Sequence, residues 1–311
     1  MAKRVRFAGC SKMSRLRRGG LAVGALLTAG LVCIASGDFQ QLRGPYLGQR
    51  LPGRTPEPFA QRLIQFSHSS IAMSPDGTEI YWAARIAGPM ASRIMVTQRL
   101  DEGWSQPVPL FVGIMSSADC PVISPDGTRM FMNSIDPLVE GERETERLWM
   151  SERDGEGWSA PVPVGSSVNA FGLHWQSSVD AKGCLYFGAV PPEGGENDDI
   201  YVSCLLGEEF QDPEKLGLSS ELDETTPFVD PRGEYILISR IDSEGGHIAA
   251  SFRNANGWTV PAKIDLGDVA YPVCPYVSPD GNYLFVLSWP NVYWVDAQVI
   301  EDARRMAAES P

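Results

Sequence analysis

The sequence predicts an all-β fold, a five-bladed β-propeller, from three observations. A tight-turn motif that ends in glycine occurs five times, and a strand-forming segment follows each copy. An aromatic residue with a proline three positions later closes four of these units. The turn glycines are 50, 56, 50 and 48 residues apart, and a nearly constant period of this size is typical of stacked structural units.

Each unit is organised around its turn motif. Proline fixes φ at about −65°, aspartate accepts hydrogen bonds from its own turn, and glycine supplies the positive φ that closes a hairpin. The five copies are Ser74-Pro75-Asp76-Gly77, Ser124-Pro125-Asp126-Gly127, Asp180-Ala181-Lys182-Gly183, Asp230-Pro231-Arg232-Gly233 and Ser278-Pro279-Asp280-Gly281.

The residues after each turn favour strands. Runs of β-branched, aromatic and long apolar residues follow the glycine, as in Ile80-Tyr81-Trp82 and Leu185-Tyr186-Phe187. A polar loop and a third strand come next. The fourth segment carries an aromatic residue and a proline, which an outer edge strand tolerates because its missing N–H is not needed there. These pairs are Trp104 with Pro107, Trp158 with Pro161, Phe210 with Pro213 and Trp258 with Pro261. Because the three tryptophans recur at one repeat position, we expect them to serve packing.

The fifth unit lacks a fourth strand of its own. Residues 53–59 resemble the fourth-strand segment that begins at Gly103, without its tryptophan. We therefore expect an N-terminal strand to complete the last blade and close the ring. A six-bladed ring is the alternative if the residues before Ser69 contain a degenerate unit.

The N-terminus has the features of an export signal. Residues 1–37 contain seven basic residues and no acidic one, and an apolar run over 21–34 precedes Ala35-Ser36-Gly37. This order is typical of a secretory signal peptide, and an uncleaved membrane anchor is the alternative. The predicted organisation is a signal or anchor (1–37), a segment with the ring-closing strand (38–66), the propeller (67–298) and a tail with a short helix (299–311). We expect a periplasmic or extracellular protein.

Charge restricts the class of partner. After removal of residues 1–37 the chain keeps 39 acidic and 19 basic residues, a net charge of −20. Such an acidic surface is unsuited to phosphate backbones, so we expect no nucleic acid, and membrane contact only through an uncleaved N-terminus. The acidic loop 193–199 could bind calcium, although it lacks the spacing of a dedicated calcium loop and a solvated loop tip explains it better. We expect no other cofactor and no dedicated metal site.

Four cysteines follow the signal. Cys184 opens one strand of the third unit and Cys204 ends the next, so a hairpin brings them together. In an oxidising compartment we expect a possible disulfide, with two buried thiols as the alternative. Cys120 and Cys274 lie at equivalent points of inner strands in units two and five, and we expect buried free thiols there.

Candidate site residues gather at the channel mouth opposite the turns, where inner strands start and second strands end. They are His68, Asp119, His174, Trp175, Glu224, Arg85, Asn133 and Arg240. One interpretation is structural, with these groups satisfying backbone and water. A second is a site for a small polar molecule, sugar or peptide, with Trp175 stacking and Arg240 orienting the ligand. A third is a metal or catalytic site built from both histidines and both carboxylates. Glycoside hydrolysis would use Asp119 and Glu224.

The repeat resembles a known group of proteins. Its Ser-Pro-Asp-Gly turns, followed by Ile-Tyr, Met-Phe or Leu-Phe, are similar to the WD40-like repeats of TolB-type β-propellers. The ending Val292-Tyr293-Trp294-Val295-Asp296-Ala297 and the opening Gly44-Pro45-Tyr46-Leu47-Gly48-Gln49 resemble a bacterial exported family of single propellers with this repeat. The resemblance covers residues 44–300 and implies a fold rather than any catalytic or binding residue.

The sequence thus favours an exported, non-catalytic propeller that acts as a ligand-binding or protein-interaction module. Its expected partner is a protein or a small polar or carbohydrate ligand. The alternative is a carbohydrate-active hydrolase with carboxylates at the channel mouth.

Overall fold

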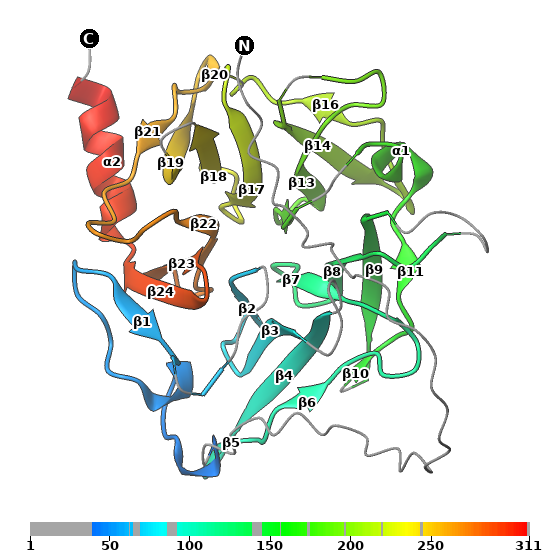
Figure 1. Cartoon of the computed structure of the whole chain (residues 1–311), viewed down its shortest axis with the longest axis vertical. Coiled ribbons are helices and arrows are strands. Elements are labelled where there is room, and N and C mark those ends of the chain that lie inside the picture. The colour runs from blue at the N-terminus through cyan, green and yellow to red at the C-terminus, as the bar shows by residue number, and fades with distance from the viewer. Residues whose placement is uncertain are drawn as a thin grey trace, which may run out of the picture. The chain divides into compact units, whose positions relative to one another are not determined.

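Five antiparallel sheets form the blades of a ring around a central channel (Figure 1). The computed structural model describes residues 39–309 except 62, 65–68, 86–91, 139–144, 156, 173–174, 196, 219 and 243–244. All of the described residues belong to one compact unit. The predicted signal at 1–37 lies outside them. Within the described part of the chain, no helix is long and apolar enough to cross a membrane.

In the first four blades the strands follow one another in sequence from the channel outward. The first blade contains β2 (Ile71–Met73), β3 (Glu79–Arg85), β4 (Ser92–Leu100), β5 (Gly103–Trp104) and β6 (Val108–Pro109). The second contains β7 (Asp119–Ile123), β8 (Arg129–Ser134), β9 (Arg147–Asp154), β10 (Gly157–Trp158) and β11 (Val162–Pro163). The third contains β12 (Ser178–Val179), β13 (Cys184–Ala189), β14 (Asp199–Leu206), β15 (Glu209–Phe210) and β16 (Glu214–Lys215).

The last two blades complete the ring. The fourth contains β17 (Asp223–Val229), β18 (Tyr235–Asp242), β19 (Gly245–Asn254), β20 (Gly257–Trp258) and β21 (Ala262–Lys263). The fifth contains β22 (Val273–Val277), β23 (Tyr283–Ser288), β24 (Asn291–Asp296) and the N-terminal β1 (Glu57–Phe59). The remaining elements are the turns η1 (Phe39–Gln41) and η2 (Tyr46–Gly48) and the helices α1 (Ser166–Asn169) and α2 (Gln298–Glu309). Helix α2 packs its buried apolar face on the fourth and fifth blades.

The N-terminal strand closes the ring, as the sequence predicted. Strand β1 pairs antiparallel with β24, placing Glu57 opposite Trp294 and Phe59 opposite Val292. Phe59 and Trp294 are fully buried, with their ring centroids 5.1 Å apart. The described residues therefore form five blades, and the six-bladed alternative is wrong for them.

The outer strand of a complete blade is split at its proline. In the first blade, β5 pairs with one end of β4 and β6 with its middle, and Pro107 lies between them. A buried hydroxyl of the third strand supports this break, because Thr97 Oγ1 donates to the Ser105 carbonyl at 2.7 Å. Ser151 and Ser251 repeat the bond in the second and fourth blades. The proline therefore interrupts an edge without leaving that carbonyl unpaired.

The turn motif works as its residues predict. All five turn glycines have positive φ, between 67° and 80°. In the first turn, Ser74 Oγ donates to Asp76 Oδ1 at 2.6 Å and accepts from the Glu79 amide at 2.9 Å. In the third turn, the single carboxylate of Asp180 replaces both the serine hydroxyl and the aspartate carboxylate. Its Oδ1 accepts from the amides of Lys182 and Cys184.

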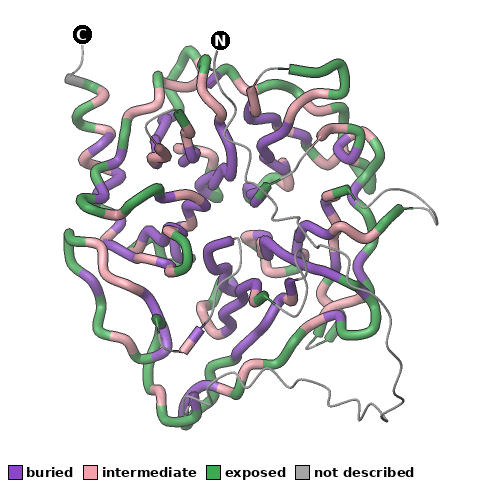
Figure 2. Tube along the Cα trace, in the orientation of Figure 1, coloured by how far each residue is buried: buried purple, intermediate pink, exposed green. Residues whose placement is uncertain are grey.

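Tryptophans at the repeat position pack between neighbouring elements, as expected. Trp104 is fully buried and donates its indole N–H to the Gly44 carbonyl at 2.9 Å. Trp158 of the second blade donates to the Tyr81 hydroxyl of the first at 3.2 Å. Buried residues concentrate along the strands (Figure 2), and the main apolar clusters join residues of adjacent blades.

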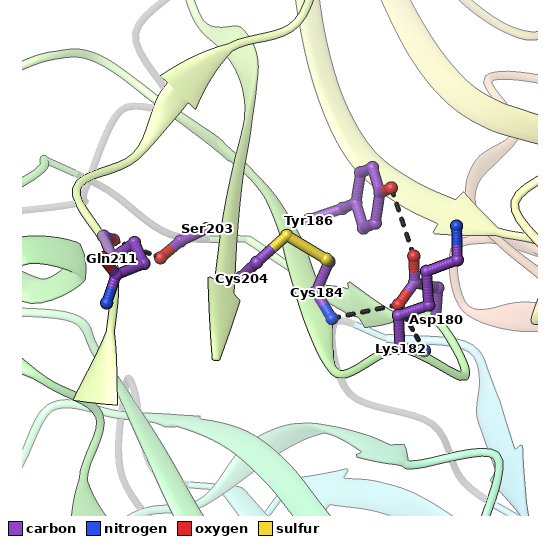
Figure 3. The surroundings of a disulfide bond; sticks show 7 residues. All are labelled: Asp180, Lys182, Cys184, Tyr186, Ser203, Cys204 and Gln211. Carbon is purple, nitrogen blue, oxygen red and sulfur yellow. Dashed lines mark hydrogen bonds between the residues drawn. A yellow bond between two sulfur atoms is a disulfide. The ribbon is translucent and has the colours of Figure 1, made fainter. Parts of the chain in front are cut away.

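A disulfide joins Cys184 of β13 to Cys204 of β14 (Figure 3), whereas Cys120 and Cys274 are buried free thiols. The bridged cysteines are 20 residues apart. Because a cross-link of this span restricts the unfolded chain, we expect the double variant Cys184→Ser, Cys204→Ser to lose about 3 kcal/mol of unfolding free energy. Denaturant unfolding measures this loss. A reducing agent should destabilise the parent protein and leave the variant unchanged.

Candidate functional site

The predicted rim residues lie at strand ends away from the turns. Asp119 begins β7 opposite Asn133, and Glu224 lies near the start of β17 opposite Arg240. Arg85 ends β3 and is exposed, and Trp175 is also exposed, at 38% of its surface. His68 and His174 lie outside the described residues.

Glu224 is engaged within its own blade. Its side chain is fully buried, and Oε1 accepts from Arg240 Nε at 3.1 Å and Nη2 at 2.9 Å. Ser220 Oγ donates to the same oxygen at 2.7 Å, which ties the preceding loop to β17. These contacts make the pair an internal clamp, since neither carboxylate nor guanidinium faces open solvent.

Asp119 and Asn133 connect neighbouring blades. Asp119 is buried, and its Oδ1 accepts from the Cys120 amide at 2.7 Å and from Ser69 Oγ of the first blade at 3.4 Å. Asn133 donates through Nδ2 to Glu146 at 2.9 Å and to the Trp175 carbonyl at 3.4 Å. These contacts favour the structural interpretation of Asp119 and Asn133.

Three inner strands carry a repeated bulge between the two mouths of the channel. Cys120, Thr226 and Cys274 occupy one repeat position, all with φ near 50° (50°, 46° and 53°), and a register shift accompanies each. Such bulges redirect the strand at the cost of local strain. From the same position in the third blade, Gln176 Nε2 donates across the channel to the Pro275 carbonyl of the fifth blade at 3.1 Å.

The channel contains a cavity at the mouth on the turn side. Its volume is about 510 Å³, and all five inner strands contribute to its wall. Ile71, Ile123, Phe228 and Tyr276 supply apolar surface. Ser177 also lines the cavity, and its buried hydroxyl has no hydrogen-bond partner within the described chain.

This cavity lies at the opposite mouth from the predicted rim. Four of the five turn motifs place a proline at the second position, and Pro75, Pro125, Pro231 and Pro279 all line the cavity. The repeated prolines were therefore the available signal. Sequence reasoning used them only to define the turns.

The acidic loop region contains one carboxyl with a raised pKa. Burial, followed by the neighbouring charges of Asp223 and Asp199, raises the pKa of Asp198 to about 6. Asp199 itself is paired with Lys215 Nζ at 2.7 Å. Among the described residues, no group of three side chains is placed to hold a metal ion. Calcium binding at this loop stays a prediction.

We expect Asp198→Asn to stabilise the protein above pH 6 and to have little effect near pH 4. The folded-state pKa lies above the usual 3.8, so the carboxyl favours folding when protonated and opposes it as pH rises through about 6. Thermal unfolding of both proteins from pH 4 to pH 8 measures the difference. Asp76→Asn is a suitable contrast, because its turn hydrogen bonds hold the pKa of Asp76 below the usual range. Parallel profiles for parent and Asp198→Asn would contradict the expectation.

Comparison with known proteins supports the fold alone. No protein-family model matches the chain, and no curated protein is similar to it in sequence. The putative TolB from Agrobacterium tumefaciens matches at 15% identity and a TM-score of 0.50, over 74% of this chain and 70% of that one. TolB from Acinetobacter baumannii matches at 13% identity and a TM-score of 0.44, over 72% of this chain and 53% of that protein. A gluconolactonase from Xanthomonas campestris matches at 14% and 0.46, over 72% and 70%. The chain therefore has a TolB-like β-propeller fold.

Proposed function

We propose that this chain is an exported, non-catalytic β-propeller that binds a protein partner through the turn-side mouth of its channel. The observation that carries the proposal is the cavity of about 510 Å³ to which every blade contributes. Its size lies within the range of ligand sites, and a concave channel mouth is the usual place for one. Export is supported by the basic and apolar N-terminus and by the disulfide, which persists in oxidising compartments.

The lining favours a peptide segment over a sugar. Ile71, Phe228 and Tyr276 offer apolar surface, whereas sugar hydroxyls need many hydrogen bonds to offset their desolvation. The carboxylates of Asp230 and Asp280 also line the cavity, but they accept hydrogen bonds within their own turns. Ser177 Oγ offers one buried polar atom for a backbone group of the ligand. An apolar side chain in the cavity, with a backbone contact to Ser177, suits this chemistry.

The hydrolase alternative has less support. A catalytic acid must reach the glycosidic oxygen of a substrate, and hydrolysis requires a second carboxylate across the sugar. Glu224 is fully buried and hydrogen-bonded to Arg240 and Ser220. These contacts leave it no path to a bound sugar.

The test is selection of random displayed peptides on the immobilised protein, followed by calorimetric titration of synthetic copies. Ser177→Leu fills the floor of the cavity, and Trp175→Ala alters the opposite mouth as the matched control. We expect binding to be lost only in Ser177→Leu, with both variants unfolding like the parent. Loss only in Trp175→Ala would move the site to the other mouth. Absence of any selected peptide would overturn the proposal.

A further inference from the structure

A second cavity lies in the crevice between the third and fourth blades. It has a volume of about 480 Å³. Four cationic and two anionic side chains line it: Lys182, Arg232, Arg253, Arg304, Asp180 and Glu234. This excess of two positive charges stands out in a chain whose net charge is −13. Comparison with the crevice between the first and second blades explains where this positive charge comes from.

Between the first and second blades, the corresponding arginine has an internal counter-ion. Arg153 of β9 stacks on Trp158, with Cζ 4.2 Å from the ring centroid, and forms an ion pair with Glu79 of β3. The same carboxylate accepts from the Tyr81 hydroxyl at 2.6 Å and from Gln98 Nε2 at 2.9 Å. A buried carboxylate thus joins the two blades through one arginine.

The crevice between the third and fourth blades has the same parts except the carboxylate. Arg253 of β19 stacks on Trp258 at 4.6 Å, and their strand register matches that of Arg153 and Trp158. Tyr186 occupies the place of Tyr81, two residues after the first residue of its strand. That first residue is Glu79 in β3 and Cys184 in β13, and the sulfur of Cys184 is bonded to Cys204.

The missing carboxylate leaves polar groups without partners. No carboxylate among the described residues forms an ion pair with Arg253 or Lys182, whereas Arg232 pairs with Glu234 at 3.1 Å. The indole N–H of Trp258 is buried and unpaired within the described chain, although that of Trp158 donates to Tyr81.

Asp180 does not replace the missing group. Its Oδ1 accepts two turn amides, and its Oδ2 lies 3.4 Å from the Tyr186 hydroxyl (Figure 3). Lys182 follows in the same turn and lies beside Asp180 in that view. The carboxylate is therefore committed to the turn. Because Arg304 pairs with Glu301 at 3.0 Å and Arg232 with Glu234, the positive charge without an ion pair among the described residues is that of Arg253 and Lys182.

We propose that this crevice binds the carboxylate of a small ligand in the place that Glu79 fills between the first and second blades. Arg253 stacked on Trp258 would donate to the carboxylate oxygens, with Lys182 adding charge. Charge-assisted hydrogen bonds of this kind are the strong ones in proteins. The site adjoins the turn-side mouth, because Arg232 lines both cavities, but it does not depend on the function proposed for that mouth.

The test is calorimetric titration of the purified chain with succinate at low ionic strength, where charge interactions are least screened. Arg253→Gln removes the central donor, and Arg99→Gln changes the equivalent exposed position of the first blade as the matched control. We expect Arg253→Gln to weaken binding at least roughly tenfold, and Arg99→Gln to leave it unchanged. Equal weakening by both, or no succinate binding, would overturn the proposal. Equal affinity for inorganic phosphate would reduce the site to an unselective anion pocket and also overturn it.

A second variant tests the comparison between crevices by creating a site. Glu79→Ala removes the internal carboxylate beside Arg153, and acetate should then raise the melting temperature of this variant more than that of the parent. Glu79→Gln is the control, because its amide fills the space that acetate would enter. If acetate does not change the melting temperature of Glu79→Ala, the comparison between the two crevices on which the proposal rests is contradicted.

Discussion

Removal of residues 1–60, which takes away β1, is expected to abolish the cooperative unfolding transition of the propeller. Removal of residues 1–38 alone should preserve it. The longer deletion leaves the fifth blade with three strands and exposes the edge of β24. It also removes Phe39, Tyr46 and Phe59, which are buried in one apolar cluster with Trp294 and Phe285.

The magnitude follows from the side chains that are lost. Deleting one buried aromatic side chain costs about 3–5 kcal/mol, and a whole domain is stable by only about 5–15 kcal/mol. Tyr46 also donates to Asp280 at 2.7 Å, which connects the N-terminal segment to the last turn. The lost contacts are therefore comparable with the total stability of the domain.

Thermal and denaturant unfolding of the two truncated proteins measure the effect. A synthetic peptide that covers residues 39–60, added to the longer deletion, should restore a cooperative transition, because β1 pairs only through its edge with β24. A scrambled peptide of the same composition is the control. Equal melting of both truncated proteins would contradict a ring held closed by β1.

The fold was predictable because its signals are local. Each turn needs a glycine with positive φ and a side chain that accepts hydrogen bonds from the turn, and both repeat with the blade. The closing strand was predictable for the same reason, since residues 53–59 resemble the fourth strand of another unit.

The candidate sites were harder to predict because they depend on contacts between blades. Glu79 and Cys184 start equivalent strands, yet only the neighbouring blade reveals that Arg153 has a counter-ion and Arg253 lacks one. Glu224 is buried because Arg240 and Ser220 lie close enough to form hydrogen bonds with it. No spacing in the sequence specifies those positions. Residue type therefore predicts candidates, whereas their burial and their partners depend on the fold.

Glu224→Ala is expected to lose about 3–5 kcal/mol of unfolding free energy, because it leaves Arg240 buried without its carboxylate. The Arg240 side chain is 13% exposed and that of Glu224 is fully buried, so solvent cannot replace the lost partner. Denaturant unfolding measures this loss. If the slope of unfolding free energy against denaturant concentration is the same in both proteins, the change reflects stability rather than a different unfolded state.

The double variant Glu224→Leu, Arg240→Met separates a structural carboxylate from a functional one. Replacing both charges of a buried pair by apolar side chains of similar volume is often neutral, so this variant should recover most of the stability that Glu224→Ala loses. If Glu224 bound a ligand instead, the double variant would be stable and still fail to bind it. Ligands of the turn-side mouth should therefore bind the double variant and the parent equally, because Glu224 does not line that cavity. If a stable double variant no longer bound these ligands, Glu224 would be a ligand-binding residue after all.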